Sequence, residues 1–127
     1  MPTVKKRRIL VVDDDESIRT FLGHVLTEEG YEVTLVNGYD EALASVQNET
    51  YDLVITDVMM PGKDGIDLLT ELKGRMPGLK VVVMSGVGRK AVLLEIASVL
   101  EADSVLEKPF GRQALLTAVR ELAPPKY

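Results

Sequence analysis

The chain has 127 residues, of which 46% are hydrophobic and 28% are charged, and its formal net charge is −5. This length and balance are typical of one globular domain and exclude an intrinsically disordered chain. The apolar runs, such as residues 81–87, are far shorter than the roughly 20 residues of a membrane span. With no cysteine, the sequence lacks disulfides and thiolate metal sites, which suits a reducing cytoplasm. We expect a single cytoplasmic domain over 1–127, with 1–7 as a lead-in and 123–127 as a tail or the start of a linker.

A basic run, Lys5-Lys6-Arg7-Arg8, precedes the first apolar segment. Too few apolar residues follow it to form the core of a signal peptide, so secretion is not expected. The acidic pI of about 4.9 opposes a general attraction to phosphate backbones. We therefore interpret the run as a solvated lead-in and expect no direct contact with nucleic acid and none with a membrane.

Short apolar, β-branched runs alternate with stretches of helical periodicity along the whole chain. The runs predict buried strands at 9–12, 33–36, 53–56, 79–84 and 104–106. The first helical stretch carries Ile18, Phe21, Leu22, Val25 and Leu26 on one stripe and ends at Gly30, and the others span about 40–47, 66–76, 90–100 and 112–122. Such alternation predicts a parallel sheet with helices on both faces, and functional sites at the carboxyl ends of its strands.

Polar residues with chemical potential follow four of the five predicted strands. Asp13-Asp14-Asp15 follow the first, Asp57 the third, Ser85 the fourth and Lys108 the fifth. Carboxylates that converge at one edge of a sheet repel one another, so a cation is expected there. Hard oxygen ligands without histidine or cysteine favour Mg²⁺ or Mn²⁺. Together with the ammonium and the hydroxyl, they suit phosphoryl transfer with Asp57 as the nucleophile.

The motifs around these residues resemble those of the response regulator receiver domains of two-component systems. They are LVVDDD at 10–15, TDVMMPGKDG at 56–65 and KPF at 108–110, with Ser85 between the last two. The resemblance covers nearly the whole chain. It implies a flavodoxin-like (βα)5 three-layer fold with strand order 2-1-3-4-5. It also implies a signalling switch, not a metabolic enzyme, that is phosphorylated by a sensor histidine kinase or a phosphotransfer protein.

The resemblance also assigns roles to individual residues. Asp57 resembles the phosphoacceptor. Asp14 resembles the direct metal ligand, together with Asp57 and the backbone carbonyl of Met59, and Asp13 resembles the residue that contacts metal-bound water. The metal implied is Mg²⁺, with Mn²⁺ possible.

Two further residues complete the implied switch. Ser85 resembles the hydroxyl residue that moves onto the phosphate, and Lys108 resembles the lysine that pairs with it. The implied partners are a downstream protein target or output domain, and a phosphorylation-dependent homodimer. The surface that would change is the one formed by the fourth helix, the fifth strand and the fifth helix. The resemblance also implies a cis Lys108–Pro109 peptide, in a turn that aims Lys108 into the acidic site.

Three positions depart from the common pattern of that family. Val105 stands where many members have an aromatic residue that swings inward, so the resemblance does not predict how this chain reads its phosphorylation state. Glu101 stands where glycine often ends the fourth helix, and Gly86 where alanine often follows the serine.

Several other residues have a structural interpretation. We expect Asp15 to cap the first helix and His24 to be exposed without a catalytic role. On the fourth helix, Leu94 and Ala91 project away from the face that should cover the sheet. Leu94 is either an ordinary exposed leucine or part of a docking surface.

Apolar residues two positions beyond Asp57 and Ser85, namely Met59 and Val87, cannot readily orient a water molecule. They predict an acyl phosphate that lasts for minutes or longer.

Two alternatives remain open at this point. One is a flavin-binding electron carrier of the same fold, although three aspartates after the first strand would repel a flavin phosphate. The other is a receiver module that belongs to a longer regulator with its own output domain. The sequence does not separate that possibility from a protein that acts alone.

Overall fold

The computed structural model describes residues 6–58, 65–86, 88, 90–99 and 101–125. Strands and helices alternate as the sequence predicts, and most boundaries fall within a residue or two of the predicted ones. The elements, in chain order, are β1 (Arg8–Val12), α1 (Glu16–Glu28), β2 (Glu32–Val36), α2 (Tyr39–Asn48), β3 (Leu53–Asp57), α3 (Gly65–Arg75), β4 (Lys80–Ser85), α4 (Lys90–Val99), β5 (Ser104–Glu107) and α5 (Arg112–Leu122).

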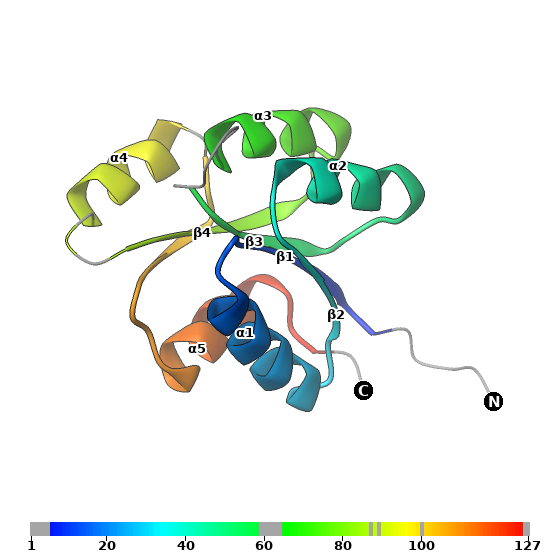
Figure 1. The fold of residues 1–127 in the computed structure, drawn as a ribbon, viewed down its shortest axis with the longest axis horizontal. Helices are drawn as coiled ribbons and strands as arrows, with labels where there is room; N and C mark the ends of the chain where they lie inside the picture. Colours follow the sequence, from blue (N-terminus) through cyan, green and yellow to red (C-terminus); the bar gives the residue numbers. More distant parts are fainter. Residues whose placement is uncertain (1–5, 59–64, 87, 89, 100, 126–127) are drawn as a thin grey trace.

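The five strands form one parallel sheet in the order β2-β1-β3-β4-β5, as predicted. Helices α1 and α5 cover one face and α2, α3 and α4 cover the other (Figure 1). Parallel strands need crossover connections, and the four helices α1 to α4 each supply one. The result is the flavodoxin-like three-layer sandwich that the family resemblance implied.

Two hydrophobic clusters lie on opposite faces of the sheet because successive strand side chains point to opposite sides. The strand residues that face α1 and α5 are Ile9, Val11, Leu53, Ile55, Val82 and Met84; those that face α2, α3 and α4 are Leu10, Val12, Val54, Val81 and Val83. All of them are fully buried. This core fixes the central strands, and therefore the positions of the residues that follow their carboxyl ends.

The edge strand β2 departs from the expectation that both faces of each strand are covered. Leu35 is 41% exposed, and Glu32 is also exposed. Leu35 lies against the backbone of α1 at Gly23, where a Cβ atom would stand 2.9 Å from its Cδ1. An edge position therefore leaves this leucine only partly covered.

Helix α1 begins and ends where the sequence indicated. Asp15 caps it by accepting hydrogen bonds from the backbone N–H groups of Ser17 and Ile18. Gly30, with a φ of 97°, follows its C-terminus in the left-handed conformation that glycine adopts most easily. His24 is exposed and pairs with Glu28 one turn later, as expected for a residue on the solvent face.

Glu101 adopts a left-handed conformation after α4, with a φ of 55°. Its carbonyl accepts a hydrogen bond from Nζ of Lys73 at 2.6 Å. This is the position where the family often has glycine, so a residue with a side chain occupies a backbone conformation that costs about 1 kcal/mol or more.

The basic N-terminal run is not simply solvated. Arg7 donates to the carbonyl of Pro124 at 3.1 Å and pairs with Asp52 at 3.7 Å. Arg8 pairs with Glu49 and lies over the ring of Tyr51, 5.2 Å from its centroid. The solvated lead-in was therefore a wrong interpretation for these two arginines. Within the described residues, none of the helices has the length and apolar content that crossing a bilayer requires.

Candidate functional site

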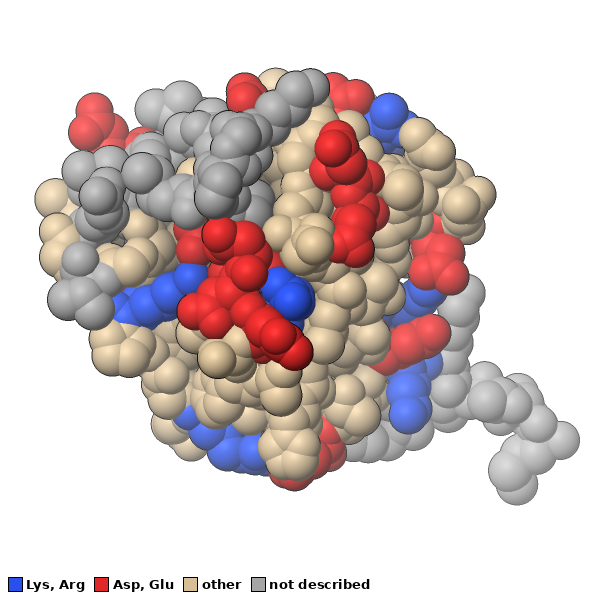
Figure 2. Space-filling model, in the orientation of Figure 1, with Lys and Arg blue, Asp and Glu red and all other residues tan. Residues whose placement is uncertain are grey.

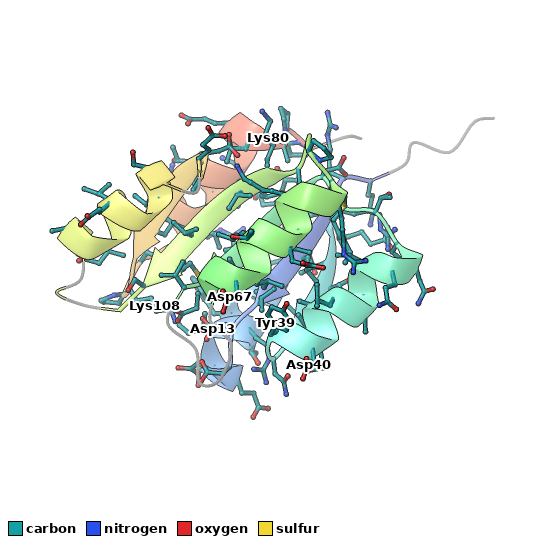
Figure 3. The ribbon with its side chains drawn as sticks, turned by 90° about the horizontal axis from the view of Figure 1, so that it is seen from above. Asp13, Tyr39, Asp40, Asp67, Lys80 and Lys108 are labelled. Carbon is teal, nitrogen blue, oxygen red and sulfur yellow. The ribbon has the colours of Figure 1, made fainter. Side chains whose placement is uncertain are left out.

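The carboxyl ends of the central strands bring the predicted polar residues together. Asp13 follows β1, Asp57 is the last residue of β3, and Ser85 is the last residue of β4. Lys108 follows β5 and points back toward Asp13 (Figure 3). The strand register aligns Val12 with Thr56, so Asp13 and Asp57 leave neighbouring strands at the same level.

Asp13 is buried, and both its backbone and its carboxylate form hydrogen bonds. Its backbone N–H donates to the carbonyl of Val36 at 3.2 Å, and its own carbonyl accepts from Nη1 of Arg19 at 2.7 Å. Its carboxylate accepts from the N–H of Asp15 at 2.9 Å and from Nζ of Lys108 at 2.7 Å. Asp13 is therefore the most constrained group at this edge of the sheet.

Lys108 bridges two of the carboxylates. Its Nζ lies 2.7 Å from Oδ2 of Asp13 and 2.6 Å from Oδ2 of Asp57, and its side chain is 17% exposed. Burial lowers the pKa of Lys108, but the hydrogen bonds and charges of Asp13 and Asp57 outweigh it, so the pKa is raised above its ordinary value. The ammonium is therefore charged at neutral pH.

The backbone around Lys108 helps to aim its side chain. Its N–H donates to the carbonyl of Ser85 at 2.7 Å, which ties it to the end of β4. The Lys108–Pro109 peptide is cis, which confirms the prediction.

Asp14 differs from its neighbours because it is exposed and, among the described residues, makes no hydrogen bond or ion pair. One oxygen atom from each of Asp13, Asp14 and Asp57 lies within 4.8 Å of the others. Acidic side chains also gather over the start of α1 on the molecular surface (Figure 2). Within the part of the chain that the structure describes, these three carboxylates outnumber the one ammonium group that pairs with them, and their hard oxygen atoms fit Mg²⁺.

The remaining predicted residues have mixed outcomes. Ser85 is 1% exposed, at the end of β4 beside the lysine backbone. Met59 and Val87 lie outside the described residues, so the backbone carbonyl expected as a metal ligand and the expected phosphate lifetime stay predictions.

Sequence analysis missed two residues that contact the site. Arg19 of α1 binds the carbonyl of Asp13, and buried Thr56 donates from Oγ1 to the carbonyl of Asp57 at 3.1 Å. Thr56 directly precedes Asp57, and Arg19 lies one helical turn after the cap Asp15. These spacings are the only signals that the sequence offered, and neither is specific.

Comparison with known proteins agrees with this geometry. Residues 9–120 match the family described as the response regulator receiver domain. The chain is 42% identical over 119 residues to the DNA-binding transcriptional regulator NtrC of Bradyrhizobium, covering 93% of this chain and 25% of that protein. It is 37% identical over 116 residues to the response regulator MprA of Mycobacterium tuberculosis, covering 91% of this chain and 50% of that protein. The chain thus spans between a quarter and a half of these relatives.

Solved structures show the same fold. The receiver domain of NtrX from Brucella abortus is 34% identical, with a TM-score of 0.84, and the match covers 90% of this chain and 96% of that one. The chemotaxis response regulator CheY4 of Vibrio cholerae is 27% identical, with a TM-score of 0.81, and the match covers 91% of this chain and 98% of that one. The chain belongs to the response regulator receiver domain family, a family of signalling domains.

Proposed function

We propose that this domain is a phosphorylation switch that accepts a phosphoryl group on Asp57 from a phosphohistidine of a sensor kinase or phosphotransfer protein. The observation that carries the proposal is the position of Lys108. Its ammonium lies between the carboxylates of Asp13 and Asp57, and an open carboxylate, Asp14, lies beside them. A nucleophile, a fixed cation and an open acidic position are what phosphoryl transfer to a carboxylate requires.

The proposed reaction is a simple displacement at phosphorus. One carboxylate oxygen of Asp57 forms a bond to phosphorus while the P–N bond of the donor breaks, and the bonding electrons return to the imidazole nitrogen. Lys108 then pairs with the new phosphate oxygens. Ser85 has a hydroxyl that can donate to the same group. In this role the domain catalyses only its own phosphorylation and a slow loss of phosphate.

A divalent cation fits the acidic cluster. Asp14, Asp57 and the backbone carbonyl of Met59 would hold Mg²⁺ or Mn²⁺, and Asp13 would contact its bound water. When bound, the ion supplies positive charge that neutralises the phosphoryl oxygens. The flavin-carrier alternative finds no support here, because a surplus of carboxylates at this loop repels a flavin phosphate unless a metal intervenes.

Phosphotransfer from a small-molecule donor tests this proposal. The parent chain incubated with acetyl phosphate and Mg²⁺ should gain the mass of one phosphoryl group, and chelation of the metal should prevent the gain. Asp57→Asn should abolish it. Asp52→Asn is the matched control, because Asp52 lies at the opposite end of the sheet and binds the N–H of Arg8. Phosphorylation of Asp57→Asn at the parental level would contradict the assignment.

We further propose that phosphorylation changes the surface formed by α4, β5 and α5. The acyl phosphate adds roughly 1.5 to 2 negative charges beside Ser85 and Lys108, which connect to the ends of β4 and β5. On α4, Ala91 is exposed and Leu94 is 48% exposed, as the helical periodicity predicts. Val105 is only partly buried on the neighbouring β5.

This surface is the proposed contact for a downstream target, an output domain or a second copy of the chain. Leu94→Glu should leave folding and phosphorylation nearly unchanged while it weakens the association of the phosphorylated form. If light scattering of the parent and the variant is the same with and without a phosphate analogue, and a target bound by the parent keeps its affinity, Leu94 is only an exposed leucine.

The extent of the domain and its partners complete the proposal. Residues 1–127 form one receiver domain, and the kinase and output partners are those that the family's signalling role implies. Because the relatives NtrC and MprA are longer than this chain, an output activity such as DNA binding would belong to residues outside it.

A further inference from the structure

Arg19 contacts the acidic site, although it is not one of the residues assigned to phosphoryl transfer. It belongs to the second turn of α1, its side chain is half-buried, and Nη1 donates to the backbone carbonyl of Asp13 at 2.7 Å. Its own N–H donates to the carbonyl of Asp15, which starts the helical hydrogen bonding of α1. The guanidinium therefore connects α1 back to Asp13, the first residue after β1.

The contact fixes a peptide plane that matters for the acidic site. The carbonyl of Asp13 belongs to the planar peptide unit that joins Asp13 to Asp14, so holding this oxygen restricts how the unit can rotate. Asp13 has other anchors, through Val36, Asp15 and Lys108. Asp14 has no hydrogen bond or ion pair among the described residues, so the position of the backbone that carries it limits the places that its carboxylate can reach.

Charge and position make opposite predictions for this arginine. As a cation near three carboxylates, Arg19 should repel a divalent metal, so its removal through charge alone should strengthen Mg²⁺ binding. If Arg19 instead holds the peptide unit that carries Asp14, its removal should let the carboxylate move and weaken Mg²⁺ binding. Residues that orient metal ligands typically change metal affinity by about 10-fold or more when they are replaced.

We propose that Arg19 is a positioning residue for the Asp14 carboxylate, and that it increases Mg²⁺ affinity even though its own charge opposes the metal. The inference rests on the proposed function, because it assumes that Asp14 is a ligand of Mg²⁺. It assigns to α1 a role in the metal site beyond its packing on the sheet.

The test measures Mg²⁺ binding directly, by calorimetric titration of MgCl₂ into the unphosphorylated full chain. Arg19→Met, which keeps most of the apolar stem and removes the donor, should raise the Kd for Mg²⁺ by about 10-fold. Arg19→Lys, which can still donate to the carbonyl, should recover most of the affinity. Arg112→Met is the matched control, because Arg112 contacts the other end of α1 through Glu28 and Glu29. It should keep the parental Kd.

A second measurement separates positioning from general damage. At a Mg²⁺ concentration well above the raised Kd, Arg19→Met should be phosphorylated by acetyl phosphate at the parental rate. Damage to the fold would not be reversed in this way. If Arg19→Met does not fold, Arg19→Gln is used with the same criterion, since its side chain is too short to reach the carbonyl.

The outcomes are distinct. A parent chain that does not bind Mg²⁺ overturns the proposed function itself. A parent that binds Mg²⁺, with an unchanged or lower Kd in Arg19→Met, overturns only the inference about Arg19. A raised Kd that Arg19→Lys does not recover, or that excess Mg²⁺ does not overcome in phosphorylation, also overturns it.

Discussion

The two ends of the parallel sheet differ in how their charged side chains are paired. At the amino end, Arg7 pairs with Asp52, and Arg8 pairs with Glu49 and lies 3.7 Å from Glu32. Basic and acidic side chains alternate along the right-hand side of the surface in Figure 2. At the carboxyl end, Lys108 pairs with Asp13 and Asp57, while Asp14 lies beside them without an ion pair among the described residues.

The difference lies in how each end balances like charges. The pairs at the amino end hold the first strand, a loop and the segment after α5 together, so they act on the fold alone. The carboxyl end keeps like charges close together, which costs free energy in the absence of a metal. Among the described residues, an excess of carboxylates over the cations that pair with them therefore distinguishes the end of the sheet where we propose that Mg²⁺ binds.

The largest expected effect is that of removing Lys108, the cation that pairs with Asp13 and Asp57 at the carboxyl end. Lys108→Met should lower the free energy of unfolding by about 3 kcal/mol, because buried Asp13 loses its partner. Saturating Mg²⁺ should restore part of the loss by neutralising the carboxylates. Chemical denaturation with and without Mg²⁺ measures both effects. A variant as stable as the parent in the metal-free state would mean that the bridge contributes nothing to the fold.

The pH dependence of this effect follows from the raised pKa of Lys108. A raised pKa in the folded state means that the stabilisation is complete below the ordinary value of 10.5 and is lost only as the pH rises through the folded-state value. The stability difference between the parent and Lys108→Met should therefore stay constant from neutral pH to about pH 9. A difference that already shrinks across this range would show that the lysine pKa is not raised.

At the amino end, Arg8→Met should lower the free energy of unfolding by about 1–2 kcal/mol. Arg8 is mostly buried, and its loss removes the pair with Glu49 and the contact with the Tyr51 ring. The Kd for Mg²⁺ and the rate of phosphorylation should not change. If either one changes while the protein stays folded, the amino and carboxyl ends of the sheet are energetically coupled.

Removing the exposed carboxylate of Asp14 tests directly whether the acidic cluster destabilises the metal-free fold. Asp14→Asn should raise the free energy of unfolding by roughly 1 kcal/mol without Mg²⁺, since an exposed like charge a few ångströms away repels by about this amount. The same variant should lose the stabilisation that millimolar Mg²⁺ gives the parent by linkage. Thermal melts measure both. Equal protection of parent and variant by Mg²⁺ would exclude Asp14 as a principal ligand.

The smallest expected effect is that of Glu101, which lies between α4 and the start of β5. Glu101→Gly should raise the free energy of unfolding by about 0.5–1 kcal/mol, because glycine adopts a positive φ without steric cost but loses more entropy on folding. Glu101→Ala keeps the Cβ atom and should give no such gain. Urea denaturation compares the three chains, and an equal gain in both variants would assign the effect to the glutamate side chain instead of the backbone.

The sequence by itself determined the order of the elements and the level of the reactive residues. Periodicity is local, so the runs at 9–12 and 53–56 predicted buried strands, and the residues that follow them had to reach the same edge of a parallel sheet. Asp13, Asp57 and Lys108 meet there as expected. The cap of Asp15 and the exposure of Leu94 also follow from local spacing.

Only the tertiary structure decided which side chains and backbone groups contact one another. Arg19 binds a carbonyl six residues before it, and Arg7 reaches the carbonyl of Pro124 from the other end of the chain. The partial exposure of Leu35 depends on β2 being an edge strand that lies against Gly23. Contacts of this kind depend on how helices and strands pack in space. The pattern of residue types along the chain does not specify which side chains come within contact distance.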